Sequence, residues 1–101
     1  MEEQQLGACM RLILIDGLKA NNVEKFNLKI DELFNTDMNF EEIVLDLVNI
    51  KNIDSVGVTF VISLYRRTEG VQKRFSISGA SDDILSLFKL MKLDQFFEMN
   101  E

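Results

Sequence analysis

Four stretches of the chain have the short apolar or alternating pattern that is typical of β-strands. In the stretch 42–48, Ile43, Leu45 and Leu47 fall on one side of the strand, and Val44, Asp46 and Val48 fall on the other. In the stretch 74–78, the apolar positions are expected to face the core and the serines to face outward. The predicted strands are Gln4–Gly7, as a weak edge strand, Met10–Ile15, Glu42–Val48 and Arg74–Ser78.

Three longer stretches have the apolar spacing of amphipathic helices. The first is Asn21–Phe34, with Asn21 or Asn22 as its predicted N-cap, and the second is Ser55–Arg67, which is expected to end at Gly70. The third begins at Ser81 or Asp82. The positions expected to be buried are Val23, Phe26, Ile30, Leu33 and Phe34 in the first helix, Val58, Val61, Ile62 and Tyr65 in the second, and Ile84, Leu87, Phe88 and Met91 in the third.

The resulting order, β-β-α-β-α-β-α, predicts an α/β fold with a mostly parallel sheet, right-handed crossovers and about three to four helices. The length of 101 residues and the absence of proline or a low-complexity stretch indicate one compact domain, residues 1–101. We expect the helices to cover one sheet face more fully than the other. The C-terminal residues Met91, Leu93, Phe96 and Phe97 are expected to pack into the core.

Three junctions between a strand and the following helix are expected to share one end of the sheet. They are residues 17–22, 54–57 and 78–81. In a parallel α/β arrangement such junctions follow the carboxyl ends of the strands, where open sheets bind their ligands. This end of the sheet is therefore the expected functional site.

Composition narrows the classes of function. Lys and Arg number 11 against 17 Asp and Glu, a net charge of −6, which argues against nucleic acid and anionic membrane surfaces as partners. Histidine is absent and Cys9 is the only cysteine. The chain therefore lacks nearly all of the residues that a zinc site, a nucleophilic triad or an internal disulfide requires, and no cofactor is expected. Cys9 is expected to be a small buried hydrophobe. No segment resembles a signal peptide or a membrane span, which predicts a cytoplasmic protein without membrane insertion.

The junction between residues 51 and 58 has the sequence KNIDSVGV, in which a buried strand ends and Asp54-Ser55 opens a helix. Taken alone, the pair is explained by helix capping, because Asp and Ser oxygens accept hydrogen bonds from free backbone amides at a helix start. Gly57 alone is explained by close packing.

The wider stretch IVLDLVNIKNIDSVGV, residues 43–58, resembles the signature of the STAS family, and anti-sigma-factor antagonists in particular. The similarity continues through LYRR at 64–67, FSISG at 75–79 and the helix at 81–90. The resemblance implies that Ser55 is a phosphoacceptor for a partner kinase that is also an anti-sigma factor. It makes Asp54, Val56 and Gly57 the switch loop, and Asp46 the aspartate that ends the central strand.

The resemblance further implies a binding switch rather than an enzyme. Unphosphorylated at Ser55, the chain would bind the anti-sigma-factor serine kinase and release a sigma factor, and a phosphoserine phosphatase would reverse the modification. Lys19 stands where the family often has an aspartate, which bears on the choice of partner. The candidate partner-binding residues are Lys19, Asn21, Asn22, Val58, Thr59 and Ser81.

Two other interpretations remain open. A STAS-like domain can also be a constitutive partner of a transporter ATPase or of a larger signalling assembly, with residues 58–65 as a docking face and Ser55 only as a cap. An enzyme would need a base beside Ser55, and the sequence offers none that is evident. The sequence does not indicate the oligomeric state.

Overall fold

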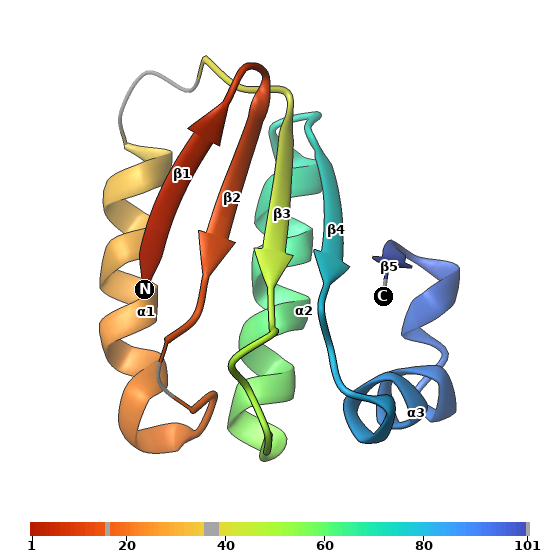
Figure 1. The fold of residues 1–101 in the computed structure, drawn as a ribbon. Coiled ribbons are helices and arrows are strands. Elements are labelled where there is room, and N and C mark those ends of the chain that lie inside the picture. Colours follow the sequence, from red (N-terminus) through yellow and green to blue (C-terminus); the bar gives the residue numbers. More distant parts are fainter. Residues whose placement is uncertain (16, 36–38, 101) are drawn as a thin grey trace.

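The computed structural model describes residues 1–15, 17–35 and 39–100. Its elements follow the predicted order, with two additions at the C-terminal end (Figure 1). These additions are a short 3-10 helix and a fifth strand. The elements are β1 (Glu2–Leu6), β2 (Cys9–Ile13), α1 (Ala20–Phe34), β3 (Glu42–Asp46), α2 (Ser55–Gly70), β4 (Arg74–Ser78), α3 (Asp82–Leu90), η1 (Leu93–Gln95) and β5 (Glu98–Asn100).

The five strands form one sheet in the order β1-β2-β3-β4-β5. β1 pairs with β2 in antiparallel fashion, and the other pairings are parallel. Leu12 lies beside Leu45, and Leu45 beside Ile77, so apolar positions on three neighbouring strands form a continuous row. The carboxyl ends of β2, β3 and β4 all lie at the same end of the sheet (Figure 1). The prediction of a mostly parallel α/β fold is confirmed.

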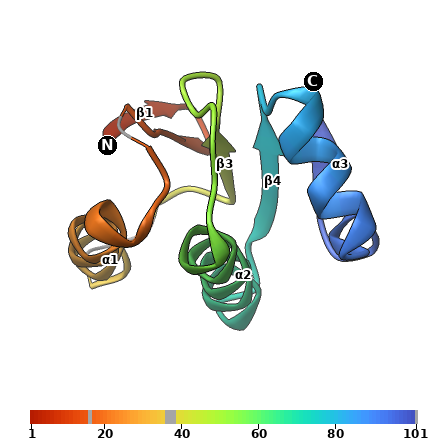
Figure 2. The same cartoon turned by 90° about the horizontal axis from the view of Figure 1, so that it is seen from below.

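Helices α1 and α2 cover one face of the sheet, whereas α3 lies beyond the β4 side (Figure 2). Leu12, Leu45 and Ile77 are fully buried beneath the two covering helices. Burying a side chain of this size contributes about 1.5–3 kcal/mol, so this row is a main source of the domain's stability. The expectation that one face is covered more fully is met.

The opposite face of the sheet carries no helix, but its side chains are not fully solvated. Asp46 and Ser76 are buried there, and Arg11, Val44 and Cys9 are half-buried. Ser76 points to this face, as predicted, but it is buried and not exposed to solvent. Cys9 belongs to this face rather than to the core, and the pKa of its thiol is raised by burial and by the nearby Glu42 carboxylate.

The buried stripe of α2 differs from the predicted one. Val58 and Val61 are buried as expected, but Ile62 and Tyr65 are only half-buried. The residues of α2 that are buried are Gly57, Val58, Phe60, Val61, Leu64 and Thr68. The stripe is rotated toward Phe60 and Leu64, which leaves Ile62 and Tyr65 facing α3 and η1.

The C-terminal segment is only partly in the core. Leu93 and Phe97 are buried, as predicted, whereas Met91 is 43% exposed and Phe96 is 59% exposed. In α3, Leu85 takes a buried position and Leu87 is half-buried. Part of the apolar surface of α3 and η1 is therefore left facing solvent.

Candidate functional site

The start of α2 is held by the side chain of Asp54, which is its N-cap. One carboxylate oxygen accepts a hydrogen bond from Gly57 N at 2.8 Å, and the other accepts one from Ala20 N at 3.1 Å. The carboxylate thus joins the first turn of α2 to the first turn of α1. Leu18 and Ile53 also form a parallel bridge between the two preceding loops. The predicted meeting of these two junctions at one end of the sheet is confirmed.

Gly57 allows these two segments to approach each other. A Cβ atom at this position would lie 2.1 Å from the carbonyl oxygen of Leu18 and 2.8 Å from Cγ1 of Ile53. No side chain fits there, because the nearest atom belongs to backbone. The glycine is required by the packing of α2 against the β2–α1 loop.

Ser55 is the first residue of α2, and its side chain is exposed. Its carbonyl oxygen accepts a hydrogen bond from the hydroxyl of Thr59, one turn later, at 2.9 Å. Asp54 already accepts the hydrogen bonds expected of the helix cap, so the Ser55 hydroxyl is not needed for this purpose. Ser55 is thus left open to solvent.

Asp46 supports the loop that leads to Ser55. The residue is 4% exposed, and its carboxylate accepts hydrogen bonds from Arg11 Nε at 3.0 Å and Nη2 at 2.6 Å. Its second oxygen accepts one from Val48 N at 2.9 Å, immediately after β3. Asp46 therefore joins β2, β3 and the beginning of the β3–α2 loop.

The model of the family described as "Mlab, STAS domain" matches residues 1–99. The chain belongs to the STAS family. No curated protein sequence matches this STAS domain. Among the described residues, none of the helices has the length and hydropathy needed to cross a bilayer.

Several solved structures share this fold. One is a Thermotoga maritima protein described as a candidate anti-sigma factor antagonist, with 18% identity and a TM-score of 0.89 over 99% of this chain and 85% of that one. A second is the Bacillus cell fate determinant SpoIIAA in its phosphorylated form, with 20% identity and a TM-score of 0.76 over 99% and 89%. A third, murine anion transporter Slc26a9, has 14% identity and a TM-score of 0.76 over 91% of this chain but only 15% of the transporter. At these identities the likeness concerns the fold.

An apolar groove runs beside Ser55 in this STAS domain. It has a volume of about 370 Å³ and lies between the first half of α2 and the second half of α3. Val58 and Ile62 form one wall, and Leu87 and Met91 form the other. Ser55 and Thr59 lie along the same groove. The sequence pattern did not predict this groove, because it placed Met91 and Ile62 in the core.

The other candidate contact residues are distributed unevenly around the site. Lys19 is exposed at the N-cap of α1, and its charge helps to lower the pKa of Asp54, which places it near the start of α2. Asn21 is exposed. Ser81 accepts a hydrogen bond from Ile84 N at 3.3 Å as the N-cap of α3, and it does not line the groove beside Ser55. The third junction, residues 78–81, therefore does not contact the groove. The part of α3 that faces Ser55 is its C-terminal end.

The predicted N-cap of α1 was wrong. Lys19 occupies the N-cap position and makes no side-chain cap hydrogen bond. Instead, Asn22 Nδ2 donates to the carbonyl oxygen of Gly17 at 2.8 Å, within the preceding loop. The free amide of Ala20 is satisfied by Asp54 from the other helix. The cap of α1 therefore comes from a residue 34 positions away, which local sequence rules do not anticipate.

Replacing Asp46 is expected to destabilise the domain by about 2 kcal/mol, because Asp46→Ala leaves Arg11 and the Val48 amide without their buried acceptor. Asp31→Ala is the matched control, since the Asp31–Arg67 ion pair has the same 2.6 Å distance but exposed side chains. It is expected to cost less than about 0.5 kcal/mol. Urea unfolding of the three proteins measures both effects. Equal losses for the two variants would contradict the role given to Asp46.

The stability supplied by Asp54 is expected to depend on pH. Hydrogen bonds from Gly57 N and then Ala20 N hold the pKa of Asp54 below its ordinary value of 3.8. Its contribution is therefore complete above that value and is lost as the pH falls through the lower folded-state pKa. We expect Asp54→Ala to be less stable than wild type at neutral pH, and this difference to shrink in acid.

Urea unfolding at neutral pH and at about pH 2.5 tests this expectation. Asp94→Ala serves as the control, because Asp94 is exposed and makes no hydrogen bond with the described residues. The Asp94 variant should follow wild type at both pH values. A difference between wild type and Asp54→Ala that stays constant with pH would count against the capping role.

Proposed function

We propose that this STAS domain is an anti-sigma-factor antagonist that is switched by phosphorylation of Ser55. In its unphosphorylated form it binds an anti-sigma-factor serine kinase, which then releases its sigma factor. The proposal places the domain in the cytoplasm, with the kinase and a phosphoserine phosphatase as its partners. The observation that carries it is an exposed Ser55 hydroxyl at a helix start, directly beside an apolar groove.

The geometry suits phosphoryl transfer by a partner. The Ser55 oxygen would attack the γ-phosphorus of ATP held by the kinase, the bond to the ADP oxygen would break, and the hydroxyl proton would pass to a base of the kinase. The domain itself has only to present the hydroxyl. Because the side chain is exposed and the helix cap is made by Asp54, this presentation needs no refolding.

The same geometry explains why a phosphate would end binding. Phosphorylation adds about −1.5 to −2 charges, and the start of a helix tolerates them through its free amides and dipole. The Asp54 carboxylate lies next to Ser55, however, so the phosphate would add to an existing negative charge. A partner packed over the groove would have to bury both charges. Mispaired charge across an interface costs several kcal/mol.

The candidate contact residues support a continuous partner surface. Val58 lies in the groove next to Ser55, Thr59 lies along it, and Lys19 lies close to Asp54. Lys19 would give the partner a positive charge to recognise where the family often has an acid. Asn21 and Val56 are exposed nearby on the first turns of α1 and α2.

Mapping the modified residue tests the proposal. The domain is incubated with ATP and the kinase captured by its binding to the domain, and the phosphate is located by mass spectrometry. We expect one phosphate on Ser55 and no modification of Ser55→Ala. Ser63→Ala, an exposed serine on the same helix, should be modified like wild type. Phosphate at another residue, or none, would refute the proposed switch.

A second candidate function is suggested by the likeness of this fold to part of the anion transporter Slc26a9. The domain would then be a constitutive partner of a transporter ATPase, using the groove between α2 and α3 and with Ser55 as part of its surface. Affinity capture from cells distinguishes the two functions. A transporter ATPase that binds wild type and Ser55→Asp equally would favour this second function over the first.

A further inference from the structure

The segments that lead into α1 and α2 run side by side where the two helices begin. A parallel bridge joins them, and the next residue of each segment, Lys19 in one and Asp54 in the other, has extended backbone. Ala20 N then donates a hydrogen bond to Oδ2 of Asp54 at 3.1 Å. Lys19 is therefore placed beside Asp54, the residue that immediately precedes Ser55.

The side chain of Lys19 is exposed and unengaged. Lys19 is the N-cap residue of α1 but makes no side-chain cap hydrogen bond, and it forms no ion pair with another described residue. Hydrogen bonds from Gly57 N and then Ala20 N are the main causes of the lowered pKa of Asp54, and the charge of Lys19, alone among the described side chains, lowers it further. Because a lysine carries its charge on a flexible stem, this ammonium group can also reach a group attached to Ser55.

Three hydrogen-bond donors around Ser55 are already in use. Gly57 N and Ala20 N donate to the carboxylate of Asp54, at 2.8 Å and 3.1 Å. The hydroxyl of Thr59 donates to the carbonyl oxygen of Ser55 at 2.9 Å. A phosphate on Ser55 would add three strong acceptor oxygens, and a donor that also carries a positive charge stabilises such oxygens most.

The groove beside Ser55 brings no cation to this position. Among the described residues that line it, Asp54 is the only charged one. The wall that α3 contributes consists of Leu87 and Met91. A positive charge for the phosphate must therefore come from the α1 side, where Lys19 lies.

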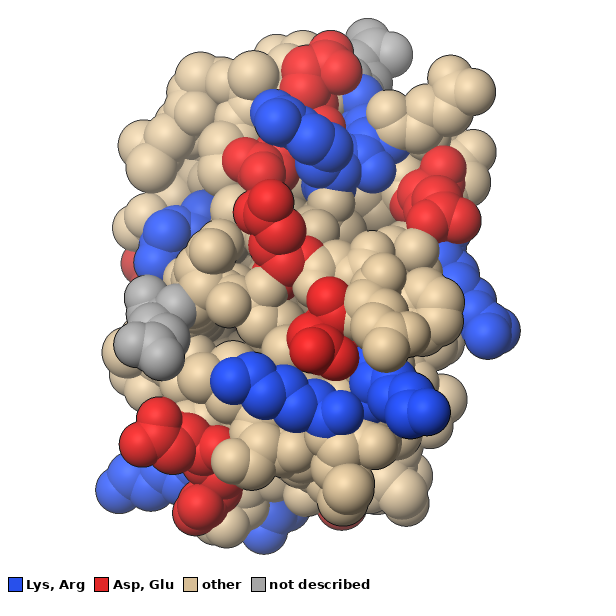
Figure 3. Space-filling view, turned by 90° about the vertical axis from the view of Figure 1, so that its right-hand side faces the viewer, with Lys and Arg blue, Asp and Glu red and all other residues tan. Residues whose placement is uncertain are grey.

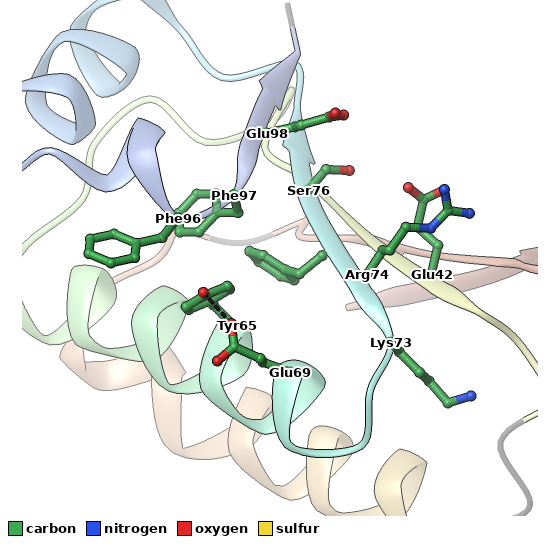
Figure 4. A pocket seen from close by; sticks show the side chains of 10 residues that line it. Glu42, Tyr65, Glu69, Lys73, Arg74, Ser76, Phe96, Phe97 and Glu98 are labelled. Carbon is green, nitrogen blue, oxygen red and sulfur yellow. Dashed lines mark hydrogen bonds between the residues drawn. The ribbon is translucent and has the colours of Figure 1, made fainter.

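The basic residues at the far end of α2 are too distant. Arg67 lies about 18 Å along the helix from Ser55 and forms an ion pair with an aspartate of α1. Figure 3 shows basic and acidic side chains side by side on the β5 side of the molecule. At the hollow beyond the end of α2, Lys73 donates to a backbone carbonyl and Arg74 lies alongside a glutamate of β3 (Figure 4). Of the described basic residues, Lys19 is the one best placed to meet a phosphate on Ser55.

We propose that Lys19 binds the phosphate of phosphorylated Ser55. This inference rests on the switch proposed above and adds a second effect to it. The dianion would draw the ammonium group of Lys19 toward itself. One modification would thus add negative charge to the partner surface and withdraw positive charge from it. A partner that recognises Lys19 with an acidic group would lose that contact and meet a phosphate instead.

Phosphorus NMR tests the pairing on the full chain with phosphoserine incorporated at position 55 during translation, so that no kinase is needed. The titration follows the phosphate between its singly and doubly charged forms, for which the ordinary pKa is about 6. A neighbouring positive charge favours the dianion. Lys19→Gln is therefore expected to raise the proton affinity of the phosphate by about two- to fivefold and to move the midpoint to higher pH. Asp54 lies beside the phosphate in every variant, so the difference between variants reports the contribution of Lys19.

Three comparisons separate this pairing from a general effect of charge. Lys19→Arg keeps the charge and should titrate like wild type. Lys29→Gln removes an exposed lysine about 15 Å further along α1 and should also titrate like wild type. The difference between wild type and Lys19→Gln should shrink at about 1 M salt, where the Debye length is about 3 Å.

An unchanged midpoint in Lys19→Gln, or an equal rise in Lys29→Gln, would overturn the proposed pairing. The switch itself can fail separately. If the kinase does not modify Ser55, the switch is refuted, whereas the titration of the incorporated phosphoserine still decides whether Lys19 binds the phosphate.

Discussion

Ser55→Asp is expected to weaken binding of the kinase partner more than a hundredfold, whereas Ser55→Ala should keep the affinity within a few-fold of wild type. The physical reason is the permanent negative charge placed beside the Asp54 carboxylate at the edge of the apolar groove. A partner covering this surface must remove water from both charges, at a cost of at least about 3 kcal/mol. That cost corresponds to more than about a hundredfold in affinity. Isothermal titration calorimetry measures the three affinities.

Ser63→Asp is the matched control for this experiment. Ser63 is an exposed serine on the same helix, and it does not line the groove. The substitution adds the same charge and should change the affinity by less than about threefold, because exposed charges are screened. Similar affinities for wild type, Ser55→Ala and Ser55→Asp would eliminate the switch. A loss as large in Ser63→Asp would mean that net charge alone governs binding.

Gly57→Ala is expected to destabilise the domain by about 3 kcal/mol. The added methyl group would lie 2.1 Å from the carbonyl oxygen of Leu18 and 2.8 Å from Cγ1 of Ile53, so α2 must move away from the β2–α1 loop. Overpacking of this kind typically costs about 1–3 kcal/mol, and contact with backbone places the effect at the upper end. Urea unfolding with an unchanged m-value would record the loss as a shift of the midpoint.

Gly70→Ala provides the comparison within the same helix. Gly70 is the last residue of α2, and nothing lies within 4 Å of the position a Cβ would take. Alanine is favoured over glycine in a helix by up to about 1 kcal/mol, so this variant should be as stable as wild type or slightly more so. If Gly57→Ala proved equally harmless, the close approach of α2 and the β2–α1 loop would not hold in solution.

The sequence was sufficient for most of the fold because the core strands and helices carry clear periodic signals. Ile43 and Leu45 alternate with less buried positions in β3, and Val23, Phe26 and Ile30 recur at helical spacing in α1. The strand β5 gave no such signal, since its three residues, Glu98–Asn100, have no apolar alternation to distinguish them from a tail. Only its pairing with β4 makes it a strand.

The orientation of α2 was predicted wrongly for a different reason. This helix has apolar residues on more than one face, including Phe60, Ile62 and Leu64, so periodicity alone allows several stripes to be buried. The contacts with the sheet and with α1 select the stripe that contains Phe60 and Leu64. The groove beside Ser55 depends on that choice, because it leaves Ile62 at the surface opposite Met91.

The residues of the candidate site could be predicted from the sequence, but the tertiary hydrogen bonds that hold them in place could not. The pair Asp54-Ser55 at a helix start and the nearby Gly57 could be identified from the chain. The hydrogen bond from Ala20 to Asp54 and the contact of Arg11 with Asp46 join residues more than thirty positions apart. Such contacts depend on tertiary packing, which local patterns do not encode.

The most direct test measures the affinity of the kinase partner for one preparation of the domain, first carrying phosphate and then after treatment with a phosphatase. If Ser55 governs recognition as we propose, removing a single phosphoryl group from this residue restores binding by more than about a hundredfold, with no change in the amide NMR spectrum beyond the α2 start. Equal affinity before and after the treatment would contradict the account.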